Sequence, residues 1–184
     1  MTAWTSFLVD AVANELELRP RWRDRVQLNC SPESAIHLAV FIEPFLQFVL
    51  DGKKTVESRF SVNRCAPYNA VRSGDLILIK RSGGPIVGVA EVSKTWFYEL
   101  DKPALRSIRT KFGSLLCVED SSFWDSKSNS CYATLIQLGQ VESITPITCL
   151  KRDRRGWVVI REPQRQYRLD AVVSQVDCGV VEKQ

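Results

Sequence analysis

The chain begins with apolar residues spaced as on one side of a helix. They recur at intervals of three and four from Trp4 to Leu16, while the acidic and amide side chains fall mostly between them. This spacing predicts an amphipathic helix, which ends before Pro20 because proline disrupts a helix interior. A short basic stretch, 19–25, follows. We interpret residues 1–35 as an N-terminal helical extension docked on the main domain.

From residue 36 the pattern changes to short apolar runs separated by turns. Proline at position 44 opens a short helix, and Gly52 stands where its C-terminal cap is expected. Two further helices are expected at 103–112 and 121–126. The expected strands are 36–42, 54–61, 76–80, 86–92 with a continuation toward 97, 131–138, 141–147 and 157–160.

Short strands, glycine turns and a few helices predict an α+β fold, a small β-barrel with peripheral helices, rather than a doubly wound sheet. We assign residues 36–150 to this barrel. Residues 151–184 then form a basic C-terminal extension, with eight cationic residues against five acidic ones, a balance of +3. The whole chain of 184 residues carries +4, which is compatible with a nucleic-acid partner.

Several classes of protein are disfavoured. No apolar run approaches the ~20 residues that a membrane span requires, and the first residues lack the basic start of a secretory signal, so we expect no membrane partner and a cytoplasmic location. Six scattered cysteines without a C-x-x-C pair predict free thiols rather than a metal site, and no cofactor is expected. The single histidine, His37, is expected to be a satisfied strand residue rather than a general base.

The most informative segment is the one between Asp51 and Arg59. On a pleated strand Thr55, Glu57 and Arg59 share one face, so Val56 and Phe60 enter the core while Glu57 and Arg59 look outward into a groove. Lys54 has the wrong parity for that face, and a bend at the start of the strand would be needed to bring it across.

This segment resembles a known family. Gly52, Lys54, Glu57 and Arg59 match the G-x-K-x-x-E-x-R signature of the ASCH family, named for a homology region in a transcriptional coactivator. The order of elements from 36 to 147 also resembles that of ASCH domains, whereas residues 1–35 have no comparable match. The resemblance implies a PUA-like barrel with a cleft beside the first barrel helix.

For this cleft the resemblance implies RNA or a nucleotide-like ligand, and DNA is a further candidate. Lys54 and Arg59 can neutralise phosphate, and Glu57 can orient Arg59 or accept from a base amino group. A plain surface ion pair between Glu57 and Arg59 is the alternative. The neighbouring Lys53 is included among the expected nucleic-acid contacts.

Two activities of ASCH-like proteins are carried over as alternatives. One branch resembles amidohydrolases that act on N4-acetylcytidine through Lys, Thr and Glu, which would correspond here to Lys54, Thr55 and Glu57, although a carboxylate stands where that branch has its threonine. The other resembles metal-independent ribonucleases, for which Lys53 or Lys54 would stabilise the phosphorane and Tyr68 or Tyr132 would transfer a proton.

The C-terminal extension supplies a second group of expected nucleic-acid contacts, in which arginines beside an aromatic ring can grip phosphates while a base stacks. These are Arg152, Arg154, Arg155 and Trp157. A third interpretation is a protein-interaction module that uses the apolar face of the N-terminal helix, through Trp4 and Phe7. The sequence does not indicate the oligomeric state.

Overall fold

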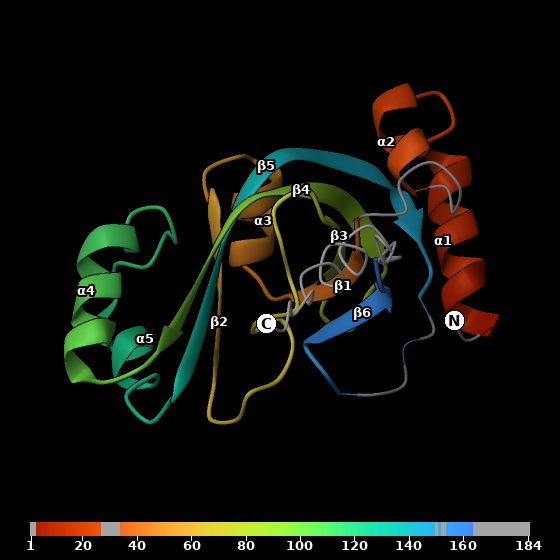
Figure 1. Cartoon of the computed structure of the whole chain (residues 1–184). Helices are drawn as coiled ribbons and strands as arrows, with labels where there is room; N and C mark the ends of the chain where they lie inside the picture. Colours follow the sequence, from red (N-terminus) through yellow and green to blue (C-terminus); the bar gives the residue numbers. More distant parts are fainter. Residues whose placement is uncertain (1–2, 27–33, 150, 152–153, 164–184) are drawn as a thin grey trace, which may run out of the picture.

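A computed structural model describes residues 3–26, 34–149, 151 and 154–163. A mixed sheet curves through the molecule as a half-barrel, with helices at both ends (Figure 1). Its spatial order is β2-β5-β4-β3-β1-β6. The strands are β1 (Ile36–Phe41), β2 (Val56–Ser61), β3 (Leu76–Arg81), β4 (Ile86–Glu99), β5 (Tyr132–Ile147) and β6 (Trp157–Arg161). The predicted α+β fold with a small barrel-like sheet is confirmed.

Five helices flank the sheet within the described residues: α1 (Ala3–Glu15), α2 (Pro20–Val26), α3 (Phe45–Leu50), α4 (Lys102–Phe112) and α5 (Ser121–Asp125). In Figure 1, α1 and α2 lie at one end of the long strands β4 and β5, and α4 and α5 lie at the other. The side chain of Asp101 caps α4 by accepting a hydrogen bond from the Ala104 amide at 2.7 Å.

The sheet has two edges, and they matter for the site. Strand β1 runs parallel to β3, and the other pairings are antiparallel. Strand β2 pairs only with β5 and strand β6 only with β1, so these two strands form the opposite edges. An edge strand exposes unpaired backbone groups, which must be satisfied in another way.

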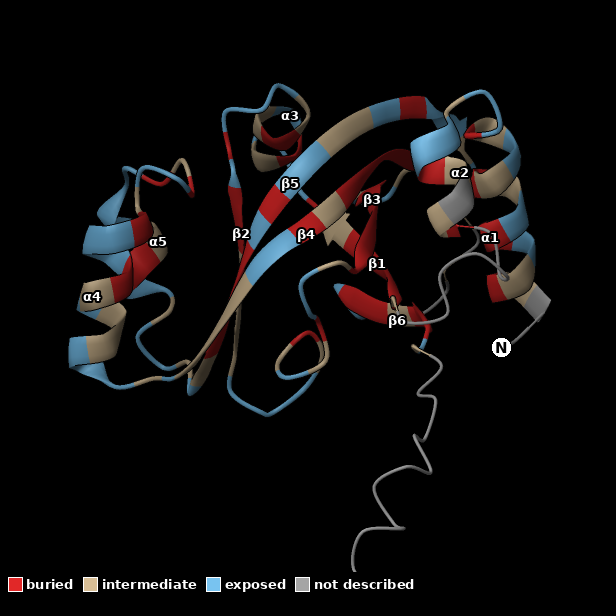
Figure 2. Cartoon of the chain, turned by 45° about the horizontal axis from the view of Figure 1, so that its top comes forward, coloured by how far each residue is buried: buried red, intermediate tan, exposed pale blue. Residues whose placement is uncertain are grey.

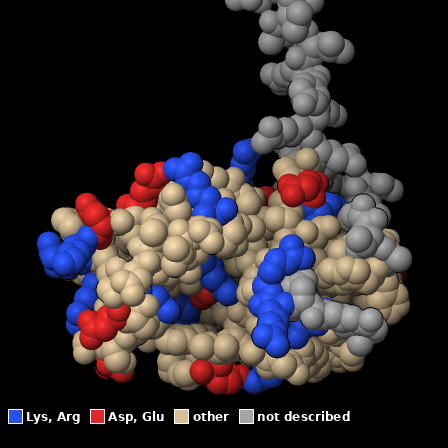
Figure 3. Space-filling view, turned by 90° about the horizontal axis from the view of Figure 1, so that it is seen from below, with Lys and Arg blue, Asp and Glu red and all other residues tan. Residues whose placement is uncertain are grey.

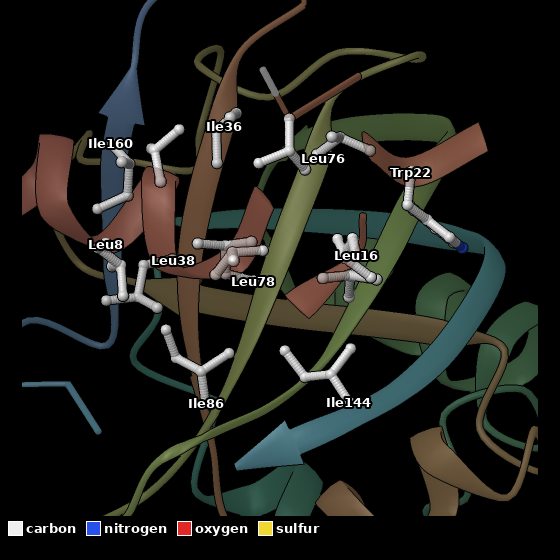
Figure 4. Close-up of a cluster of buried hydrophobic side chains, with 14 of the residues drawn as sticks. Leu8, Leu16, Trp22, Ile36, Leu38, Leu76, Leu78, Ile86, Ile144 and Ile160 are labelled. Atoms are coloured by element: carbon white, nitrogen blue, oxygen red, sulfur yellow. The ribbon is translucent and has the colours of Figure 1, made fainter. Parts of the chain in front are cut away.

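The N-terminal helices share a core with the sheet. Leu8 from α1, Leu16 from the turn that follows it and Trp22 from α2 pack against the side chains of β1, β3 and β6, as Figure 4 shows. Two arginines of α2 strengthen this docking, because Arg21 and Arg25 both pair with Glu91 of β4 at 2.7 and 2.9 Å. The predicted docking of this segment is therefore observed, while the domain boundaries of the sequence analysis stay an interpretation.

Two further clusters complete the core. One lies between α3 and the central strands and includes Leu46, Ile77 and Ile136, and the other joins α4 and α5 to the β2 end of the sheet through Ile108, Trp124 and their neighbours. Figure 2 shows that buried residues concentrate on the central strands and on the sheet-facing sides of the helices.

One helix was not assigned from the sequence, and one expectation needs correction. The basic stretch 19–25 lies largely in α2, which begins at Pro20, where a missing amide donor costs nothing. The strands expected at 131–138 and 141–147 form one long strand, β5. Gly139 lies within this strand, where a Cβ would meet the side chain of Ser93 on the neighbouring strand β4.

The structure also bears on membrane insertion and on the cysteines. None of the described helices has the length and apolar character needed to cross a bilayer. Cys65, Cys117, Cys131 and Cys149 are free thiols, and the other two cysteines lie outside the described residues.

The shared core predicts that α1 contributes to the stability of the whole fold. Leu16 is fully buried, so Leu16→Ala should lower the free energy of unfolding by about 2–5 kcal/mol, the usual cost of a buried leucine. Urea denaturation followed by tryptophan fluorescence measures this change. Phe7→Ala within α1, where the side chain is 70% exposed, should change it by less than about 0.5 kcal/mol. Loss of α1 in a separate early transition, with the barrel unaffected, would contradict the prediction.

Candidate functional site

Lys54 is positioned by the end of helix α3. Gly52 adopts φ +71°, a conformation that favours glycine, and turns the chain back so that the Lys54 amide donates to the Phe48 carbonyl at 2.9 Å. The Lys54 side chain is 3% exposed. Its Nζ donates to the Leu116 carbonyl at 3.1 Å and lies 5.3 Å from the centre of the Phe45 ring. The turn at Gly52 thus supplies the bend that the parity of Lys54 requires.

Glu57 and Arg59 project from one face of β2, as their alternation predicts. Glu57 lies between two cations: its Oε2 is 3.6 Å from Lys54 Nζ and its Oε1 is 2.9 Å from Arg59 Nε. The Nε–H of Arg59 has no hydrogen bond of good geometry, so this contact is an ion pair. The structure brings the three predicted head groups together.

Their burial corrects one expectation. The sequence predicts that Glu57 and Arg59 face outward, but Glu57 is only 6% exposed and the side chain of Arg59 only 21%. The opposite charges and nearby aromatic rings compensate for the lost hydration, and a buried charge without such partners would be very unfavourable.

Arg59 also connects the two edges of the sheet. Its Nη2 donates to the Val40 carbonyl at 2.9 Å, and its Nη1 donates to the Gly156 carbonyl, next to β6, at 3.2 Å. The guanidinium carbon lies 5.3 Å from the Phe41 ring and 5.4 Å from the Trp157 ring. The planar fork of arginine suits this double contact, and much of its donor capacity is used within the protein.

A cavity of about 270 Å³ lies along edge strand β2. Figure 3 shows a depression in the centre of the molecular surface seen from below, with atoms of both charge signs inside it. The aromatic side chains that line the cavity come from β1, α3, β2 and α5. The lining residues are Val40, Phe41, Ile42, Phe45, Lys54, Glu57, Ser58, Arg59, Phe60, Val118, Phe123 and Lys127.

Sequence reasoning missed three contributors to this cavity. Phe45 and Phe123 read as core residues of amphipathic helices, and their rings pack edge to face at 6.3 Å. Lys127 follows α5, and its Nζ lies 5.0 Å from the centre of the Phe123 ring. No local pattern identifies these residues, because the approach of α5 to β2 is set by the packing of distant segments.

The environment of Lys54 changes its acid–base behaviour. Burial lowers the pKa of Lys54 below the usual value for lysine, because the charged ammonium loses hydration. The Glu57 carboxylate opposes this effect by favouring the ammonium form, and Arg59 adds to it by repulsion. A lysine of lowered pKa can exchange a proton nearer to neutral pH than an exposed one.

Four other residues proposed for this site lie elsewhere. Lys53 is exposed and pairs with Asp51 at 3.4 Å, and Thr55 is also exposed, so neither lines the cavity. Tyr68 and Tyr132 pack against each other at 5.0 Å beneath Arg64 and do not line it either. Thr55 shares the strand parity of Glu57 but precedes β2, where the chain is still at the surface.

The residues expected to bind nucleic acid in the C-terminal extension differ in their exposure. Arg152 lies outside the described residues, whereas Arg154 and Arg155 are exposed. Trp157 is 4% exposed, so its ring packs in the core rather than offering a face to a base.

His37 is satisfied, as the sequence predicts. The Trp157 Nε1–H donates to His37 Nδ1 at 3.1 Å, and the other ring nitrogen lies 3.0 Å from Asp75 Oδ2. Because indole nitrogen only donates, Nδ1 carries no proton and Nε2–H donates to the carboxylate. This buried chain of contacts fixes β6 to β1. Among the described residues no cluster of three or more His, Cys, Asp or Glu side chains could hold a metal ion.

The charge arrangement predicts a measurable coupling between Glu57 and Lys54. In wild-type protein, the pKa of Lys54 followed by the titration of its Cε resonance should fall below the ~10.4 of an unperturbed lysine. In Glu57→Gln it should fall further, because the opposing attraction is lost while the burial remains. Thr55→Ala, beside the site but exposed, should leave it unchanged. A pKa that rises in Glu57→Gln would contradict this assignment.

The bridging role of Arg59 predicts a specific effect on β6. Arg59→Lys keeps the charge but cannot reach both carbonyls, so the free energy of unfolding should fall by about 1–3 kcal/mol. Hydrogen exchange should accelerate in β6 more than in β3. The matched change Arg81→Lys, at an exposed ion pair with Glu43, should have little effect on either measurement. Equal effects of the two changes would rule out the bridge.

Comparison with solved structures identifies the fold. The chain is similar to an ASCH protein from Zymomonas mobilis, with a TM-score of 0.55 and 16% identity over 70% of this chain and 90% of that chain. Two variants of the same protein, with tyrosine-to-phenylalanine and serine-to-alanine changes, give TM-scores of 0.53 and 0.55 at 15% identity. They cover 70% and 72% of this chain and 92% and 93% of theirs. No family model matches the sequence, and no curated protein does so either. At such identities the similarity defines the architecture: the chain has an ASCH-like α+β fold.

Proposed function

We propose that the chain binds RNA, or a nucleotide released from it, by taking one nucleobase into the cavity along β2. The observation that carries this proposal is a buried carboxylate, Glu57, held between two cations in the wall of a cavity lined by aromatic rings. The aromatic rings correspond to the faces of a nucleobase, and the carboxylate corresponds to its amino group.

The aromatic walls suit a flat ring. Phe41, Phe45, Phe60 and Phe123 line the cavity, and stacking of a base on an aromatic side chain contributes about 1–3 kcal/mol. The cavity volume, about 270 Å³, lies just below the ~300–1,000 Å³ typical of small-molecule sites. The space therefore suits one base with part of its sugar rather than several stacked nucleotides.

Glu57 favours bases that carry an amino group. A carboxylate only accepts hydrogen bonds, and its two oxygens have more acceptor positions than Lys54 and Arg59 occupy. Adenine, cytosine and guanine offer an exocyclic amino donor. Uracil carries a carbonyl oxygen at the position of the cytosine amino group, which a carboxylate repels, so the N3–H is the one donor left at that edge. We therefore expect amino-bearing bases to bind more tightly than uracil.

The roles that we propose for the cationic residues differ from the phosphate contacts that the sequence suggests for Lys54 and Arg59. Lys54 and Arg59 are occupied by Glu57 and by backbone carbonyls, so their main role is to orient the carboxylate. Lys127 also lines the cavity and has no carboxylate partner within the described residues, so it is the better phosphate contact. Phosphate contacts of this kind position a ligand without reading its sequence.

A second candidate function is hydrolysis of an RNA-derived substrate in the same cavity. The lowered pKa of Lys54 favours it, because this amine can transfer a proton near Glu57. Ser58, which also lines the cavity, supplies a hydroxyl there, whereas Thr55, Tyr68 and Tyr132 do not line it. These placements argue against the threonine and tyrosine roles considered from the sequence.

Calorimetry with the four ribonucleoside monophosphates and their deoxy counterparts tests the proposal. AMP, CMP or GMP should bind more tightly than UMP. Glu57→Gln should weaken the amino-bearing ligands by about 1–3 kcal/mol and UMP by less, because one acceptor pair is lost. Lys127→Ala should weaken the monophosphates but not the free nucleosides. Lys53→Ala is the control, since Lys53 lies outside the cavity.

Two outcomes would count against nucleobase recognition: equal affinity for all four bases, or unchanged affinity in Glu57→Gln. Chromatography of the same samples after incubation separates binding from hydrolysis. Conversion of the ligand, abolished in Lys54→Met, would favour the hydrolase over the binding protein.

A further inference from the structure

Helix α4 carries an unusual distribution of charge. Its eleven residues, KPALRSIRTKF, include four cations and no acid. Lys102, Arg106 and Arg109 recur at intervals of four and three, so they share one side of the helix, while Lys111 lies off this line. All four side chains are exposed, and none of the salt bridges among the described residues involves them.

Lys102 and Arg106 do not serve the stability of the helix. Like charges four residues apart, such as Lys102 and Arg106, repel each other. Lys102 also lies in the first turn, where the helix dipole disfavours a cation. Only the last-turn cations, Arg109 and Lys111, are favourably placed with respect to the dipole. Cations kept at positions that cost stability point to a negatively charged partner.

A hollow of about 510 Å³ lies beside this side of α4. Lys102 and Arg106 line it together with Leu100, Leu105, Ser128 and Ser130, so two cationic side chains and two serines border a largely apolar space. Lysine, arginine and serine side chains contact phosphate oxygens in nucleic-acid complexes. The one carboxylate in its lining, Asp101, is already engaged as the cap of α4.

The hollow adjoins the cavity. Lys127 lines the cavity, and Ser128 and Ser130 line the hollow, so one tight turn forms part of both walls. The turn is closed by a hydrogen bond from the Ser130 amide to the Lys127 carbonyl at 2.9 Å. Consider a single-stranded RNA with one base in the cavity and the phosphate of that nucleotide near Lys127. Its next nucleotides would reach Lys102 and Arg106 by crossing this turn.

We propose that the side of α4 bearing Lys102, Arg106 and Arg109, with its hollow, binds the sugar–phosphate backbone of nucleotides next to the one held in the cavity. This inference rests on the proposed function and extends it from a single nucleotide to a single-stranded RNA. The contacts are with phosphate, so they add affinity without sequence preference.

The test compares a mononucleotide with longer RNA. Wild-type protein is titrated with CMP and with cytidylate oligomers of up to about eight nucleotides, a length within the range that single-strand sites cover. Affinity should rise as the oligomer lengthens. In Lys102→Ala/Arg106→Ala the affinity for CMP should stay unchanged, while that for the longest oligomer should fall on the order of tenfold. The slope of log affinity against log salt should decrease by about 1.4, which corresponds to two lost phosphate contacts.

Lys53→Ala/Lys111→Ala is the matched control, because it removes the same charge from exposed positions that line neither space. It should bind all ligands as the wild type does. An equal loss in this control would mean diffuse attraction and would overturn the proposal. So would an unchanged oligomer affinity in Lys102→Ala/Arg106→Ala.

Two further outcomes separate the proposals. If wild-type protein binds the oligomers but Glu57→Gln and Lys127→Ala leave CMP binding unchanged, the cavity proposal fails, and with it the inference that depends on it. In the other outcome, polyglutamate binds wild-type protein and loses affinity in Lys102→Ala/Arg106→Ala, while RNA affinity is unaffected. Helix α4 then binds an acidic protein partner, and the proposed contact with the RNA backbone is wrong.

Discussion

Glu57 lies between Lys54 and Arg59, and the polar wall of the cavity depends on this contact. A carboxylate that is 6% exposed loses most of its hydration, which costs several kcal/mol unless nearby charges compensate. Two cations do so here, at 2.9 and 3.6 Å. They are in turn held by three backbone carbonyls, those of Leu116, Val40 and Gly156. The carboxylate is therefore fixed before any ligand arrives, which reduces the entropy lost on binding.

This arrangement explains why the signature residues are spaced as they are. Gly52 allows the chain to leave α3 with a positive φ, and Lys54 follows close enough to reach back over the Phe45 ring. Glu57 and Arg59 are two residues apart on a strand, so their side chains share a face. Both side chains line the cavity that lies along β2.

Much of the fold follows from local pattern. Strands β1, β3 and β6, the helix over 103–112 and the turn at Gly52 are encoded by apolar runs and glycine positions that act over a few residues. The convergence of Lys54, Glu57 and Arg59 was also predicted, since it depends on strand parity and one bend. The sequence does not predict how deeply these groups are buried, nor the aromatic wall, nor the place of Lys127. These features depend on how α5 packs near β2. Thr55 shows where a prediction from strand alternation fails. It has the same parity as Glu57, but it lies before β2 begins and does not line the cavity.

Arg59 has a consequence for the order in which the protein is completed during synthesis. Its partner Gly156 lies 97 residues further along the chain. The ribosome makes the helix, the lysine and the glutamate early, but the carbonyl and the indole that hold the guanidinium emerge only with β6. Until then Arg59 lacks its anchor on the opposite edge, so a nascent chain that ends before β6 would carry the residues of the cavity without its final geometry.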